Sequence, residues 1–419
     1  MLSLPFTFAV LPPAQAAAII VVVGISMALT AHALLSAYAT AATNAKGDTS
    51  NVGAGHTDLA SYRSLATHAV SRRCVGSVRI ARDMMPHIGA LAYDIVCTGH
   101  YATLPASTRT TIETTLLWAA FGVVVFPLCI LRSLSGLRIP NVCGLACSVF
   151  MIALVVYRGV ASPPLTHAAM ANALAIPNIN DTDASGRMAQ IPQSDTQHFL
   201  RATQAVSIYS YAFTVHLNLL PLFLQLGGAD NNGEVLIAHS KRLMTKCIVT
   251  ITLLSTALFI VFGVFASRLY GGATSVQGNI VTNMQTDPSM RLPLVAVFFV
   301  VLLSFPLLFH PGRVIVQELL TQEPAALLRW KSRIVTAVVL LAAELFVATW
   351  VPSIDVVFAF VGATTTVFNS YVIPVFLFTA LYPWRDTRRG QLWCCLLWGI
   401  VTVAVTMGMR TVVFLLTDA

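Results

Sequence analysis

Apolar stretches of roughly 20 residues recur along this chain of 419 residues, and they restrict its fold more than any other feature. A helix of about 20 residues crosses the ~30 Å hydrocarbon layer of a membrane. Only 10% of the residues are charged and the mean hydropathy is +0.76, whereas soluble globular chains carry roughly 25% charged residues. The sequence therefore predicts an all-α, polytopic membrane protein embedded in a lipid bilayer.

The apolar pattern predicts ten membrane spans preceded by a half-span. The half-span covers 1–10, and the spans cover 14–42, 84–104, 114–131, 141–157, 203–226, 247–267, 292–312, 334–352, 354–381 and 391–417. The segments between them are too short for a soluble domain. We therefore expect one transmembrane domain over 1–419.

The net charge of +8 does not indicate nucleic-acid binding, because the basic residues lie between spans instead of on one face with interleaved aromatic residues. With the turn at Pro12 and Pro13 outside, 18 of the 25 Lys and Arg residues fall in inner segments and 6 in outer ones. This excess predicts an extracellular or lumenal C-terminus. The only N-glycosylation sequon begins at Asn180, in the longest predicted outer loop, and agrees with that orientation.

Enzymatic and metal-dependent functions find little support in the sequence. The eight cysteines lie in or beside predicted spans without nearby histidines at metal-site spacing, which is typical of small residues packed between helices. No Ser/His/Asp or HExxH arrangement occurs, so hydrolase chemistry has no visible apparatus. We expect a protein that is not an enzyme and needs no cofactor.

The span 203–226 is unusually polar for a membrane helix. Its polar residues and its proline are Ser207, Tyr209, Ser210, Tyr211, Thr214, His216, Asn218 and Pro221. One interpretation is an inward-facing, unwound helix whose free backbone groups bind a polar solute. The other is a set of interhelical hydrogen bonds, worth only ~0.6 kcal/mol each.

The span 292–312 ends in LLSFPLLFHPGR, where Pro306 and Pro311 free backbone carbonyls. Carbonyls and the Ser304 hydroxyl are the neutral oxygen ligands that a Na⁺ site requires. Ser304 has a second interpretation, a hydrogen bond to the carbonyl of its own helix. His310 is either a proton relay or a histidine at the membrane interface.

Charged residues at membrane depth cost ~2.5–3.5 kcal/mol each and are functional candidates. Asp94, beside Tyr93 in the span 84–104, is a candidate partner for a proton or cation. Glu344 and Arg410 are candidates for a structural ion pair. His216 is a further candidate for ion coupling.

Five segments resemble the amino acid/auxin permease family, which contains neutral amino acid transporters and vacuolar amino acid transporters. MLSLPFTFA at 1–9 looks like the second half of the family's first helix, and PLCILRSLSGLR at 127–138 like the end of its fourth. YAFTVHLNLLPLFLQL at 211–226 is similar to its sixth helix, LLSFPLLFHPGR to its eighth, and VFAFVGATTTVFNSYVIPVFLF at 357–378 to its tenth. The resemblance spans nearly the whole chain.

The resemblance implies a LeuT-like fold of inverted five-helix repeats plus an extra helix. The first repeat would cover about 1–158, the outer loop about 159–201, the second repeat about 202–381 and the extra helix about 391–417. An amino acid would bind between broken helices one and six. Matching positions place Tyr93, Tyr209, Ser210, Tyr211 and Ala212 at the substrate, and Ser304 where some sodium-coupled members carry a cation-binding threonine. Ser3 and Phe213 are further substrate-binding candidates, and Ser304, Asp94 and His216 are the candidates for coupling Na⁺ or H⁺.

The chain begins where the family's first helix has already entered its Gly-rich stretch, which predicts either an incomplete chain or a degenerate paralogue. Two functions follow from the resemblance. The first is secondary active transport of amino acids across the plasma membrane or a vacuolar or lysosomal membrane, with neutral substrates favoured because 203–226 holds no acidic residue. The second is an amino acid sensor, or an inactive paralogue, of the same fold.

Overall fold

The computed structural model describes residues 3–47, 123, 125–131, 136, 138–161, 195–227, 233–270, 276, 278–321, 330–350 and 354–417. Within these ranges the chain is helical and contains no strand, as the sequence predicts. Six of the helices are long and apolar enough to cross a membrane. The protein is therefore a polytopic membrane protein.

The helices overlap the predicted spans, and several of them extend beyond the predicted bounds by more than a turn. They are α1 (Leu4–Val10), α2 (Pro13–Gly47), α6 (Phe126–Cys129), α7 (Arg138–Ala161), α9 (Asp195–Ala212), α10 (His216–Gly227), α11 (Gly233–Leu269), α12 (Ile280–Thr286), η5 (Pro288–Met290), α13 (Arg291–Thr321), α14 (Trp330–Trp350), α15 (Ile354–Val361), η7 (Gly362–Val372), α16 (Ile373–Leu381), η8 (Trp384–Asp386) and α17 (Arg388–Thr417). The predicted span 84–104 lies outside the described residues, and of 114–131 only the end is described.

Two predicted spans are not regular α-helices. The span 203–226 is divided into α9 and α10 by the non-helical residues 213–215. The span 354–381 changes from α15 to an 11-residue π-helix, η7, and back to α16. In contrast, α13 runs as one helix through both Pro306 and Pro311.

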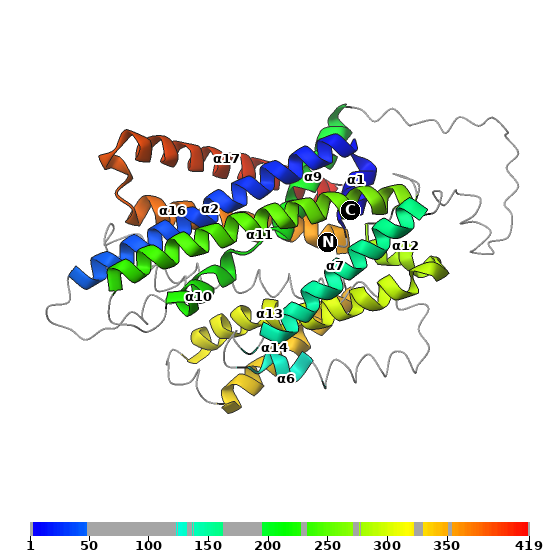
Figure 1. Cartoon of the computed structure of the whole chain (residues 1–419), viewed down its shortest axis with the longest axis horizontal. Coiled ribbons are helices and arrows are strands. Elements are labelled where there is room, and N and C mark those ends of the chain that lie inside the picture. The colour runs from blue at the N-terminus through cyan, green and yellow to red at the C-terminus, as the bar shows by residue number, and fades with distance from the viewer. Residues whose placement is uncertain are drawn as a thin grey trace, which may run out of the picture.

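The helix α2 occupies a central position. It packs against α11, α16 and α9, and Figure 1 shows α2 and α11 side by side over most of their length. On the other side of α11, α7 packs against α13, which in turn contacts α14 and α6 (Figure 1). The short α1 packs on α11 and α9. Residues of the predicted half-span 1–10 and of the predicted spans 203–226 and 354–381 are thereby brought together around α2.

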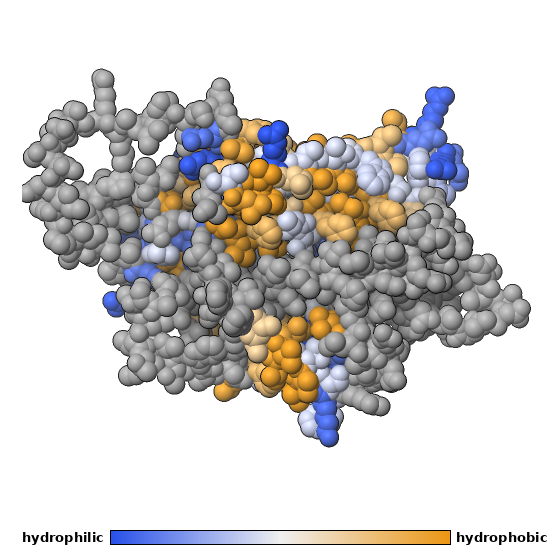
Figure 2. All heavy atoms as spheres, turned by 180° about the vertical axis from the view of Figure 1, so that it is seen from behind, coloured by the Kyte–Doolittle hydropathy of each residue, from blue (hydrophilic) through white to orange (hydrophobic). Residues whose placement is uncertain are grey.

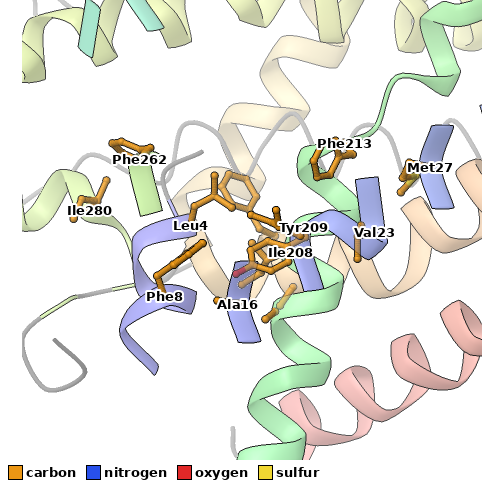
Figure 3. Close-up of a cluster of buried hydrophobic side chains, with 14 of the residues drawn as sticks. Leu4, Phe8, Ala16, Val23, Met27, Ile208, Tyr209, Phe213, Phe262 and Ile280 are labelled. Carbon is orange, nitrogen blue, oxygen red and sulfur yellow. The ribbon is translucent and has the colours of Figure 1, made fainter. Parts of the chain in front are cut away.

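The main core lies where α1, α2, α9 and α11 meet. Figure 3 shows Leu4 of α1 close to Ile208 and Tyr209 of α9, and all three side chains are fully buried. Outside this core, long apolar side chains are exposed on α2, α7, α11, α13, α14 and α17. Figure 2 shows apolar residues spread over the described surface, with hydrophilic ones at its edges. Such a surface is favourable only against lipid.

Candidate functional site

The polar centre of the molecule is the interruption between α9 and α10. The last α-type bond of α9 runs from Phe213 N–H to Tyr209 O (3.1 Å), and beyond it the turn bonds Thr214 N–H to Tyr211 O (3.1 Å) and Asn218 N–H to Val215 O (3.3 Å) bridge the gap. Thr and Val are β-branched and weak helix formers, which favours an interruption here. At membrane depth a break persists only where it packs on protein or lines a cavity.

Hydroxyl contacts hold the α9 side of the break. Tyr209 Oη lies 2.6 Å from Thr7 Oγ1 of α1. The single proton of the Thr7 hydroxyl is donated to Leu4 O, so Tyr209 donates and Thr7 accepts. The predicted site residue Tyr209 is therefore hydrogen-bonded to α1, which lies in the predicted half-span 1–10.

A second chain of hydroxyls crosses from α9 through η7 to α2. Ser210 Oγ lies 3.5 Å from Tyr371 Oη, and Tyr371 Oη lies 3.0 Å from Ser26 Oγ. Because Ser26 donates its proton to Val23 O, the proton of Tyr371 is donated to Ser26, and Ser210 donates to Tyr371. One tyrosine of η7 thus joins the helix before the break to α2.

The α10 side of the break is held by His216, whose side chain is fully buried. Its Nε2 lies 3.0 Å from Thr30 Oγ1 on α2. Thr30 donates its own proton to Met27 O, so Nε2 carries a proton and donates to Thr30. This tautomer leaves Nδ1 as an acceptor, and Nδ1 is buried without a hydrogen-bond partner in the described structure.

The π-helix η7 supplies the facing wall. Thr366 Oγ1 accepts a hydrogen bond from Thr214 Oγ1 inside the break at 3.4 Å, and Thr366, Asn369, Ser370 and Tyr371 are all buried. Gly362 at its start allows close approach, because a β carbon there would collide with the backbone carbonyl of Ser207. A π-helix is rare and is found frequently at functional sites.

Several buried polar atoms around the break have no hydrogen-bond partner among the described residues: Ser3 Oγ, His216 Nδ1, Asn218 Oδ1 and Ser370 Oγ. Buried polar groups in native proteins are normally paired with protein or water. Leaving one unpaired costs about 1–3 kcal/mol. These atoms, at the start of α1, on α10 and on η7, are groups that water or a polar solute could pair with.

Aromatic rings border the break on the α9 side. Tyr211 stacks on Phe358 of α15, with ring centroids 4.7 Å apart and an interplanar angle of 22°. Phe213 makes an edge contact with Phe259 of α11 at 5.3 Å. Tyr211 and Ala212 are half-buried, so they border the break without being sealed within the core.

The remaining predicted site residues lie elsewhere. Ser304 is half-buried on α13 and faces α7, because a β carbon on Gly144 would lie 3.6 Å from its Oγ. His310, on the same helix, is buried. Tyr93, Asp94 and Asn180 lie outside the described residues. Within the described ranges no three His, Cys, Asp or Glu side chains gather as candidate metal ligands.

Sequence reasoning missed the partners that α2 and η7 contribute. Ser26 and Thr30 are one helical turn apart in a strongly apolar span, and Thr366, Asn369 and Tyr371 lie in a segment singled out only as a family match. The i, i+4 spacing of the two α2 hydroxyls was the available signal, since it places both on one helix face. The density of polar residues in 364–371 was another.

Fold and site together define a class: a polytopic helical membrane protein in which one interrupted helix forms a buried polar centre. Within that class the chain belongs to the transmembrane amino acid transporter protein family, whose model matches residues 1–417. It is similar to vacuolar amino acid transporter 7 of Saccharomyces cerevisiae, with 29% identity over 209 residues. That match covers 48% of this chain and 36% of the relative.

Proposed function

We propose that this protein is a secondary active transporter of amino acids that binds its solute at the break between α9 and α10. The observation that carries the proposal is the buried break itself, tied by hydroxyls to α1, α2 and η7 and bordered by unpartnered polar atoms. Purely structural hydrogen bonds between helices would not require a helix to unwind. Membership of the transporter family and the vacuolar relative support the same function.

The two helix ends at the break suit the two charges of an amino acid. The N-terminus of α10 presents free N–H groups and a partial positive charge, which favours a carboxylate. The C-terminus of α9 carries a partial negative charge, which favours an ammonium group. The side chain of the solute would then pack near Tyr211 and Phe213. Because 203–226 holds no acidic residue, neutral amino acids are favoured.

Coupling to H⁺ or Na⁺ would supply the energy for uphill transport. His216 Nδ1 is the proton acceptor that the described structure offers, since it is buried, unpartnered and next to the break. Ser304 is the candidate hydroxyl ligand for Na⁺, and Asp94 a further candidate. We propose alternating access by LeuT-like repeats divided at about 158 and 202, in a plasma or vacuolar-type membrane, with the C-terminus extracellular or lumenal.

The test is uptake of labelled neutral and charged amino acids into proteoliposomes that contain the purified chain. A pH gradient and a Na⁺ gradient are imposed separately. We expect accumulation under one gradient, a marked loss in Thr214→Val and no change in Thr402→Val, an exposed position on α17. No accumulation under either gradient overturns the proposal. Amino acid binding without flux would instead establish a sensor.

A further inference from the structure

A second polar cluster lies away from the break, where α13, α14 and the residues after α6 meet. Arg313 of α13 is only 1% exposed, and its Nη2 donates to Leu131 O at 2.8 Å. Arg333 of α14 donates from Nη1 to the neighbouring carbonyl, Ile130 O, at 3.4 Å. Two guanidinium groups therefore converge on consecutive carbonyls. Figure 1 shows α6, α13 and α14 together at this end of the molecule.

These two groups are not satisfied by the described protein. Arg313 Nε and Nη1 and Arg333 Nε are buried without hydrogen-bond partners, and neither arginine forms an ion pair with a carboxylate in the part of the chain that the structure describes. A buried cation without a counter-charge is costly, and two adjacent ones also repel each other. Backbone carbonyls alone neutralise neither charge.

The surrounding contacts make this a formed site. Gln317, one turn after Arg313 on α13, donates from Nε2 to Ser332 Oγ at 2.9 Å, directly beside Arg333 on α14. The same three helices, α6, α13 and α14, are held together by a cluster of buried side chains that includes Cys129, Phe309 and Ala337. Arg333 and Leu131 are half-buried, so the site is reached from their side.

We propose that Arg313 and Arg333 bind a phosphate-bearing anion that joins α13, α14 and the segment after α6. A phosphate monoester carries a charge of about −1.5 to −2 near neutral pH, which matches two guanidinium groups. Guanidinium nitrogens also match phosphate oxygens in geometry. An amino acid fits less well, because its ammonium group would meet two cations. The Lys and Arg distribution predicts that both arginines lie at the inner membrane surface, where anionic lipids are found.

The experiment measures thermal unfolding of the purified full chain in a neutral detergent. The probes are a phosphatidylinositol phosphate, phosphatidylcholine and inorganic phosphate. We expect the phosphoinositide to raise the unfolding midpoint, and phosphatidylcholine to leave it unchanged. A shift with inorganic phosphate alone at similar concentration would assign the site to free phosphate, and a shift restricted to the lipid would assign it to a headgroup. No shift with either phosphate probe overturns the proposal.

Variants locate the site. We expect Arg333→Gln to need about tenfold more probe for the same rise in the unfolding midpoint, because one charge-assisted hydrogen bond is lost. Arg333→Lys should need a smaller increase in probe concentration. Arg389→Gln, on the exposed start of α17, is the matched control and should respond as the unmodified chain does. Arg313→Gln is a stricter test if that variant folds. An undiminished response in Arg333→Gln overturns the proposal.

Discussion

Tyr371 of η7 connects three elements around the break. Its hydroxyl accepts a hydrogen bond from Ser210 of α9 and donates one to Ser26 of α2. We expect Tyr371→Phe to lower the free energy of unfolding by roughly 1 kcal/mol, the loss of two interhelical hydrogen bonds at ~0.6 kcal/mol each. Amino acid uptake should fall more than stability does, because α9 is no longer fixed to α2. Thermal unfolding in detergent and proteoliposome uptake measure the two effects.

The control for Tyr371→Phe is Tyr382→Phe. Tyr382 is half-buried and stacks on Phe378 through its ring, at 4.7 Å, so removing its hydroxyl leaves that contact intact. It should resemble the unmodified chain in both measurements. Equal uptake by the two variants would contradict a role of the hydroxyl chain in transport.

Thr30 has a separate effect through His216. Thr30→Val removes the acceptor for Nε2–H, which leaves both ring nitrogens of a fully buried histidine without a partner. We expect a loss of about 1–3 kcal/mol in the free energy of unfolding. Thr30→Ser keeps the hydroxyl and should lose much less. Thermal unfolding of both variants checks this, and a similar loss in both would show that the methyl group matters instead.

At the scale of elements, η7 and α17 fit together through small residues. A β carbon on Gly408 of α17 would collide with the carbonyl oxygen of Ala363 in η7. We therefore expect Gly408→Ala to push α17 from η7 and to destabilise the protein by about 1–3 kcal/mol, the usual cost of overpacking. On the same helix, Gly399 has nothing within 4 Å of the corresponding position. Gly399→Ala should be neutral or slightly stabilising, and unfolding midpoints compare the two directly.

The elements show what sequence can and cannot predict here. Apolar length alone located α7 and α17 to within a few residues, because a membrane helix must satisfy its own backbone. The same argument gives no sign of η7, because apolar length does not distinguish a π-helix from an α-helix. The break was indicated by the polar density of 203–226. Its location at 213–215, before Pro221 and not at it, depends on contacts with η7 and α2.

The hydroxyls of α2 show a related limit. Ser26 and Thr30 both donate to carbonyls of their own helix, as isolated membrane hydroxyls commonly do. From the sequence alone, the hydroxyls of both residues are therefore expected to bond only to carbonyls of their own helix. Only the packing of η7 and α10 on α2 turns them into acceptors for Tyr371 and His216. A functional role for such residues arises from tertiary contacts that no local pattern records.

For the whole molecule, the distribution of Lys and Arg predicts the direction of insertion. Arg385, Arg388 and Arg389 form a basic group at the turn between α16 and α17, which the excess of inner positive charge assigns to the cytosolic side. The helix α17 is long enough to cross the bilayer once, so the C-terminus then lies on the opposite side. Arg388 is exposed. We expect the thiol introduced by Arg388→Cys to react with a membrane-impermeant maleimide only from the cytosolic side.

The thiol introduced by Thr417→Cys, at the exposed end of α17, provides the opposite arm and should react only from the extracellular or lumenal side. Native thiols such as Cys395 lie within membrane-spanning helices, where a charged reagent reacts poorly, and the unmodified chain measures that background. Labelling of intact and permeabilised membranes distinguishes the sides. If both introduced thiols react from the same side, α17 does not cross the membrane. If the two sides are exchanged, the positive charges lie outside, and Arg313 and Arg333 would then face the leaflet poorer in anionic lipid.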